Sequence, residues 1–119
     1  METINLKEKF SCFTDYCNPR VIGEINDCAV KVVKLKGEFI WHHHDIEDEL
    51  FLVVKGTLRM KFRDHEAVVR EGEFVIVPRG VEHCPIADEE VHIVLIEPKS
   101  TLNTGNIVNE RTVAQLERI

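Results

Sequence analysis

The sequence predicts an all-β domain, and two observations carry this prediction. Short runs rich in Val, Ile and Phe follow one another from residue 29 to residue 97, each ending at Gly, Pro or a charged cluster. No helical stretch separates these runs, so the parallel crossovers that need one are excluded, and an antiparallel sandwich or barrel is expected. The eight expected strands cover residues 29–36, 38–43, 49–54, 57–62, 66–70, 73–78, 81–86 and 91–97.

The segment before the strands, residues 1–28, is expected to pack on the outside of the barrel. Leu6, Phe10 and Phe13 recur at helical spacing after Asn5, which is a suitable N-cap residue. The pattern predicts one short amphipathic helix or turn.

Within the barrel, residues 29–98, the strands differ in how their two faces alternate. Residues 57–62 alternate cleanly between apolar and polar side chains, so this strand has one face in water. Residues 38–43 and 49–54 are apolar on both faces. The positions expected to point inward are mainly apolar and predict a small, dry cavity: Ile40, Phe51, Val53, Leu58, Met60 and Phe62.

On the expected strands 38–43 and 49–54, the face opposite the inward positions forms an apolar stripe. A lone domain would leave this stripe in water. A homodimer would cover it, and so would the N-terminal segment or the C-terminal tail, residues 99–119, which is rich in turn residues. The stripe consists of Phe39, Trp41, Leu50, Leu52 and Val54.

Composition excludes several classes of function. The chain has 119 residues, enough for one domain, and its formal net charge of −6 offers no basic surface for nucleic acid. It has neither a polybasic segment for lipid nor an apolar run long enough for a signal peptide or a membrane span, so a cytoplasmic location is expected. The four cysteines form no C-x-x-C pair and are expected to be reduced.

A candidate metal site begins at two histidines. His42 and His44 are two residues apart, so on a strand they share a face, with Cα atoms separated by roughly 6.6 Å. His43 lies between them and is expected to point away. Glu49 opens the next strand, and a hairpin would return its carboxylate to the histidines. Glu47 and Asp48 are close rivals for this third position.

A further histidine, His83, follows a rigid turn containing Pro78 and Gly80 that can aim it at the same point. Imidazole nitrogen and carboxylate oxygen suit a divalent Fe, Mn, Ni, Zn or Cu ion. The remaining candidates, His65, His92 and Cys84, are expected to have structural roles only.

These residues resemble the two motifs of the cupin superfamily. Gly37, His42, His44, Glu49 and Gly56 follow the first motif, and Gly72, Pro78, Gly80 and His83 follow the second. Gly37 stands one residue closer to His42 than usual, and Ala87 replaces the Asn that ends the second motif. The resemblance, which covers roughly residues 29–98, implies a double-stranded β-helix, or jelly-roll, barrel with His42, His44, Glu49 and His83 as metal ligands.

The pattern is similar to the small single-domain bacterial cupins that are compared with the metal-binding part of phosphomannose isomerase. Four protein ligands would leave two positions of an octahedral ion open for a small polar substrate, as in an oxygenase of the dioxygenase type, an isomerase or a lyase. No catalytic base can be named from the sequence. The alternative is a non-catalytic module that binds a small ligand through the metal, or a partner of another protein.

Overall fold

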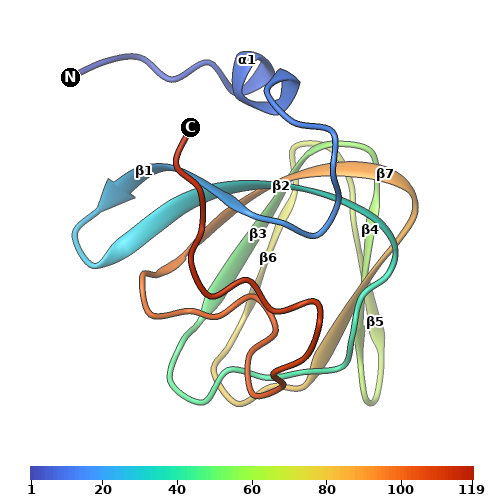
Figure 1. Cartoon of the computed structure of the whole chain (residues 1–119). Helices are drawn as coiled ribbons and strands as arrows, with labels where there is room; N and C mark the ends of the chain where they lie inside the picture. The colour runs from blue at the N-terminus through green and yellow to red at the C-terminus, as the bar shows by residue number, and fades with distance from the viewer.

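Seven strands and one short helix make up the computed structural model, which describes residues 1–119 (Figure 1). The elements are α1 (Leu6–Ser11), β1 (Arg20–Ile25), β2 (Cys28–Glu38), β3 (Glu49–Lys55), β4 (Leu58–Phe62), β5 (Glu66–Val69), β6 (Phe74–Val77) and β7 (His83–Pro98).

The strands are antiparallel throughout and close around a common interior. The main order is β1-β2-β7-β3-β6, while β4 pairs with β5 and with the first residues of β7. The 16-residue strand β7 pairs with β4 near its start, with β3 in its second half and with β2 along most of its length, so it passes from one layer to the other. The predicted all-β jelly-roll fold is confirmed.

Individual strands differ from the prediction in three places. Residues 39–48 form an irregular connection in which His42 makes only an isolated bridge, so the expected strand 38–43 is not formed. The two strands expected at 81–86 and 91–97 are one continuous strand. An additional strand, β1, lies in the segment expected only to pack, and it pairs with β2.

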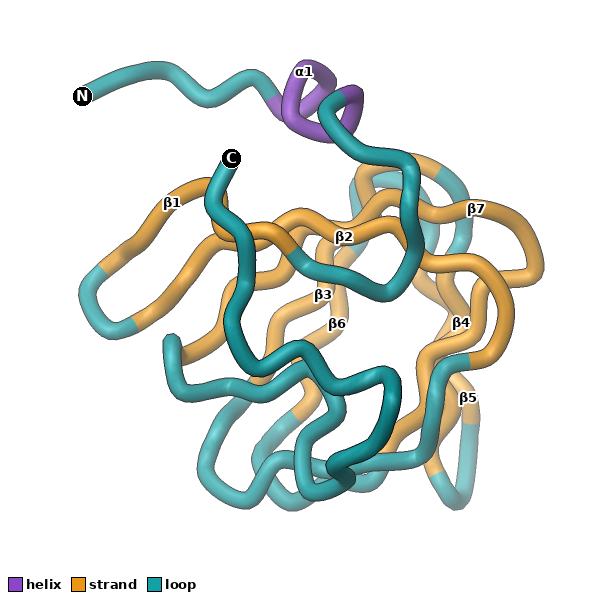
Figure 2. Tube along the Cα trace, viewed as in Figure 1, coloured by secondary structure: helices purple, strands orange, loops and turns teal.

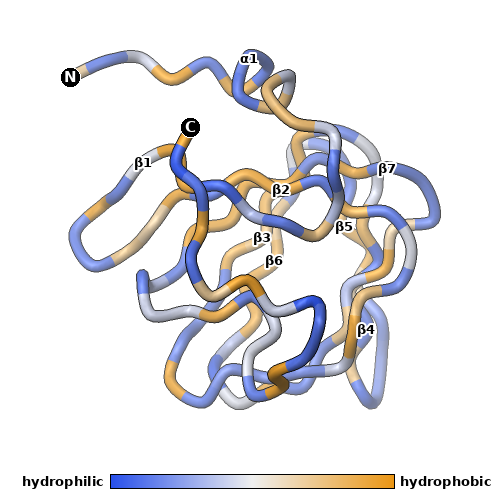
Figure 3. Tube along the Cα trace, viewed as in Figure 1, coloured by the Kyte–Doolittle hydropathy of each residue, from blue (hydrophilic) through white to orange (hydrophobic).

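The core lies between the layers and is built from side chains that alternate inward along the strands. Figure 3 shows this alternation of apolar and polar residues along the chain. Four of the six positions predicted to point inward belong to the main buried cluster: Phe51, Val53, Leu58 and Met60. Phe62 packs against the cluster, whereas Ile40 is half-buried and is not part of it.

The outer face of the sheet carries a second cluster under α1. Asn5 caps the helix by accepting a hydrogen bond from the Glu8 amide at 3.0 Å, as predicted. Phe10 and Phe13 pack on the sheet, and two residues of the expected stripe, Leu52 and Val54, lie against this cluster. The N-terminal segment therefore covers part of the stripe.

The remaining stripe residues do not form one surface. Phe39 lines a small cavity, and the guanidinium of Arg63 lies 3.9 Å from the ring centroid of Trp41. Leu50 stays on the outer face, half-buried. The predicted continuous stripe is wrong for Phe39 and Trp41, because residues 39–48 leave the strand path that the alternation assumed.

The C-terminal segment crosses one end of the barrel, where the loops gather (Figure 2). The amide of Val21 donates to the Glu117 carbonyl, and the amide of Ile119 donates to the Val21 carbonyl, so the end of the chain lies along β1. The amide of Asn106 donates to the His43 carbonyl at 3.0 Å. The tail thus contacts the connection that carries two predicted ligands.

Candidate metal centre

The four predicted ligands come from three places in the fold. His42 and His44 lie in the connection between β2 and β3, Glu49 is the first residue of β3, and His83 is the first residue of β7. We refer to these four residues as the ligand cluster. All four are buried, although no regular strand carries the two histidines of the connection.

Backbone hydrogen bonds hold the irregular connection against the rest of the barrel. His42 and His83 exchange a pair of amide-to-carbonyl hydrogen bonds at 3.0 and 2.9 Å. The amide of Gly80, in the turn predicted to aim His83, donates to the His44 carbonyl at 2.7 Å. The connection therefore has a fixed place relative to the start of β7.

Two of the imidazoles are also fixed through their Nδ1 atoms. The Nδ1 of His42 donates to the Ile40 carbonyl, and that of His83 donates to the Val81 carbonyl, each at 2.9 Å. A histidine that uses Nδ1–H in this way presents its unprotonated Nε2 to a metal. Both rings are therefore in the form that ligates an ion.

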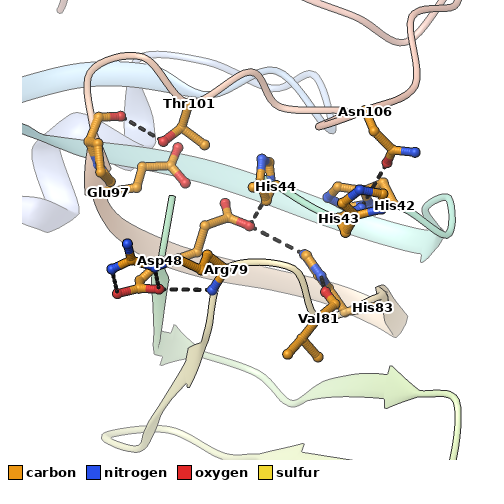
Figure 4. A network of polar contacts seen from close by, with 12 residues as sticks. His42, His43, His44, Asp48, Arg79, Val81, His83, Glu97, Thr101 and Asn106 are labelled. Carbon is orange, nitrogen blue, oxygen red and sulfur yellow. Dashed lines mark hydrogen bonds and ion pairs between the residues drawn. The ribbon is translucent and has the colours of Figure 1, made fainter. Parts of the chain in front are cut away.

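The ligand cluster converges on one point. One nitrogen or oxygen atom from each of the four side chains lies within 4.8 Å of the other three. In Figure 4 His44 and His83 are joined to the same carboxylate: Oε1 of Glu49 lies 2.7 Å from Nε2 of His44 and 3.3 Å from Nε2 of His83.

The chemistry of these atoms fits a divalent ion. The Nε2 atoms of His44 and His83 and Oε1 of Glu49 are buried, and they have no hydrogen-bond partner outside this group of three atoms. Buried polar atoms without a partner are costly, and a metal ion would satisfy all three at once. The structure thus contains a buried His-His-Glu-His cluster compatible with a metal ion.

The environment favours the protonation states that metal binding needs. Burial, and next the neighbouring His83, lower the pKa of His42 to about 4. Burial alone would raise the pKa of Glu49, but hydrogen bonds to Glu97, His44 and His83 outweigh it and hold that pKa well below its ordinary value. A neutral imidazole and an ionised carboxylate are the ligating forms.

A small cavity of about 40 Å³ adjoins the cluster. His42, Glu49 and Glu97 lie on its wall, and most of the other lining side chains are apolar. This volume holds about three water-sized groups. A small cavity with mainly apolar walls is present, as expected, but of the six positions predicted to point inward only Phe51 lines it.

The rival acidic residues have other partners. Asp48 pairs with Arg79, whose amide donates to it at 2.8 Å, and Glu47 accepts a hydrogen bond from Ser100. His43 points away from the cluster, as predicted, and its Nε2 lies 2.9 Å from Asp45.

The remaining candidates also lie outside the ligand cluster. His65 is exposed beside Asp64, and His92 stacks on Phe10 with ring centroids 4.7 Å apart. Cys84 is buried on the strand that carries His83, with its thiol 3.8 Å from a carboxylate oxygen of Glu38.

Two buried charged residues near the cluster were missed by the sequence reasoning. Along β2, Lys31 lies on the same face of the strand as the core residues Val33 and Leu35. Along β7, Glu97 lies on the same face as the core residue Leu95. The sequence signal that could have revealed them is a charged residue at an inward-facing position of an apolar strand, because such a residue must find a buried partner.

No helix is long and apolar enough to cross a membrane.

The family model described as "Cupin domain" matches residues 30–97. An uncharacterized protein of Bacillus subtilis (strain 168), YdbB, is 38% identical over 79 residues, which are 66% of this chain and 64% of that protein. The chain thus matches slightly less than two thirds of that relative's length.

Two solved structures are similar to the chain over most of its length. A cupin-2 domain containing protein from Shewanella frigidimarina is 48% identical, with a TM-score of 0.81 over 82% of this chain and 95% of that one. A protein from Neisseria meningitidis is 34% identical, with a TM-score of 0.76 over 82% of this chain and all of the other.

Proposed function

The chain belongs to the cupin family, and from that premise we propose that it is a metal-dependent enzyme acting on a small polar molecule at a mononuclear three-histidine, one-glutamate site. The observation that carries this proposal is the convergence of four buried ligand atoms beside a cavity. A divalent ion held there would supply Lewis acidity or, if redox-active, electron transfer to the substrate.

The chain's own residues determine which substrates fit. A cavity of about 40 Å³ admits a headgroup of a few non-hydrogen atoms, so the rest of a larger substrate must stay outside. Its apolar walls, which include Phe39 and Phe51, exclude water from the reacting group. We infer that the substrate presents a compact oxygen-bearing headgroup, as in an enediol or a hydroxy acid.

The test is reconstitution followed by turnover assays. Protein loaded anaerobically with Fe(II) is mixed with small enediols, hydroxy acids and thiols, and oxygen uptake is recorded; protein loaded with Mn(II) or Zn(II) is assayed for isomerisation or elimination. Turnover by wild type that is lost in a His42→Ala/His44→Ala variant supports enzymatic activity at this metal site. A fully loaded protein without turnover would favour the non-catalytic binding module instead.

We also propose that the chain forms a homodimer through the part of the outer face that α1 leaves uncovered. Phe74 and Ile76 of β6 are 59% and 52% exposed, and the strand register places Ile76 beside Leu50 and Leu50 beside Ile96. β6 is also the end strand of its sheet order. A second copy presenting the same surface would cover both the apolar row and the strand edge.

A further inference from the structure

Lys31 and Glu97 form a buried ion pair that the ligand cluster does not include. Nζ of Lys31 lies 2.7 Å from Oε1 of Glu97, and their side chains are only 3% and 2% exposed. A buried pair of this kind is weak evidence for stability, because apolar residues of similar volume often stabilise a fold as well or better. Its position in the fold calls for another explanation.

The register of three neighbouring strands places this pair in a row with a proposed ligand. In the β3–β7 ladder Leu50 is opposite Ile96, so one step further Glu49 comes opposite Glu97. In the β2–β7 ladder Lys31 is opposite Leu95, which makes Glu97 its diagonal neighbour on the same face. The backbone therefore orders the side chains as Lys31, Glu97 and Glu49 across the inner face.

The two oxygens of Glu97 have different surroundings. Oε1 is taken by Lys31, while Oε2 is buried and has no hydrogen-bond donor from the rest of the chain. The strand register places the Glu97 carboxyl beside that of Glu49, and both line the cavity beside the cluster. Figure 4 shows Glu97 at the edge of the site, on the side away from His83.

We propose that Lys31 and Glu97 form a positioning pair for the metal centre: Lys31 donates to Oε1 of Glu97, and Oε2 of Glu97, as a protonated carboxyl oxygen, donates to the Glu49 carboxylate and holds it with one oxygen toward the three imidazoles. This inference rests on the proposed metal site. Glu97 is not among the four convergent residues, so it acts through Glu49. Partners that orient a ligand from behind typically change metal affinity by about 10- to 100-fold when removed.

The experiment compares two double variants that both avoid an unpaired buried charge. Lys31→Met/Glu97→Leu removes the pair, whereas Lys31→Met/Glu97→Gln keeps a side-chain amide that can still hydrogen-bond to Glu49. Arg59→Gln/Asp88→Asn, which removes an exposed ion pair elsewhere, is the matched control. Each folded protein is titrated with Co(II), recording both the dissociation constant and the ligand-field absorption spectrum.

The Leu variant is expected to bind Co(II) about 10- to 100-fold more weakly and with altered absorption bands, because Glu49 is no longer held. The Gln variant loses the Lys31 contact but keeps a donor toward Glu49, so its Co(II) affinity is expected to lie between that of the Leu variant and that of wild type. The control is expected to match wild type in affinity and spectrum. Wild-type affinity and spectrum in the Leu variant would overturn the positioning role. Absence of Co(II) binding by wild type would instead contradict the metal site itself.

Discussion

Nε2 of His44 lies 2.7 Å from Oε1 of Glu49, and both atoms are buried, with Nε2 of His83 3.3 Å from the same oxygen. The pair lies in the interior of the barrel, where an unsatisfied polar atom is expensive. An ion bound between them would be a partner for both. Folding and metal binding should therefore be coupled.

The first prediction concerns this coupling. A metal that binds only the folded state stabilises it by about 2.7 kcal/mol at a free concentration of 100 times the dissociation constant. Adding Mn(II), Zn(II) or Ni(II) to metal-free protein should raise the melting temperature by several degrees, and a chelator should reverse the shift. A His42→Ala/His44→Ala variant that shows the same rise would place the binding elsewhere.

The second prediction concerns pH in the metal-free protein. Burial, then His83, lower the pKa of His42 from its ordinary 6.5 to about 4, so between these values the unfolded state carries a proton there that the folded state lacks. As pH falls through this window, the free energy of unfolding of wild type should decrease by on the order of 3 kcal/mol more than that of a His42→Gln variant. Urea unfolding of both proteins at pH 7.5 and pH 4.5 measures this difference, and parallel stability profiles would contradict it.

The third prediction concerns the C-terminal tail. Gly105 has φ of +58°, and a Cβ there would lie 2.2 Å from the His43 carbonyl oxygen and 3.0 Å from the His42 ring. Gly105→Ala should therefore destabilise the fold by more than the roughly 1–2 kcal/mol of left-handed backbone strain alone and should weaken metal binding.

Gly72→Ala is the matched control for this substitution, because Gly72 also has positive φ but nothing within 4 Å of an added Cβ. It should show the strain cost with unchanged metal affinity. Equal effects of the two substitutions on metal affinity, measured by calorimetric titration, would contradict a role for the tail in holding His42.

The fourth prediction concerns self-association. Replacing both Phe74→Ser and Ile76→Ser should convert a dimer into a monomer of 13.7 kDa, as measured by light scattering after gel filtration. Val68→Ser, at an exposed position on β5, should leave the mass unchanged. A wild-type protein that is already monomeric at high concentration would contradict the proposed interface.

The sequence was most informative where chemistry limits the choice of residue. The histidine and glutamate spacing predicted that these side chains meet, because side chains proposed to share one ion must come together whatever path the backbone takes. That independence explains why the cluster was predicted correctly although His42 and His44 do not lie on the strand that the spacing argument assumed.

Backbone detail was less predictable. Pro85 and the acidic residues 88–90 look like strand breakers, yet β7 runs through them because it bends from one layer to the other at an exposed point. The strand β1 contains Gly23 at an irregularity in its register, and it gains its place from pairing with β2 and with the end of the chain. Lys31 and Glu97 could be paired only once the register between β2 and β7 was known.

The most direct test of the central claim is elemental analysis of protein purified without an affinity tag, before and after reconstitution. Wild type should contain about one divalent transition-metal ion per chain, and a folded His42→Ala/His44→Ala variant should contain none. A wild-type protein that takes up no metal, or a variant that keeps a full complement, would contradict the claim that these four side chains share an ion.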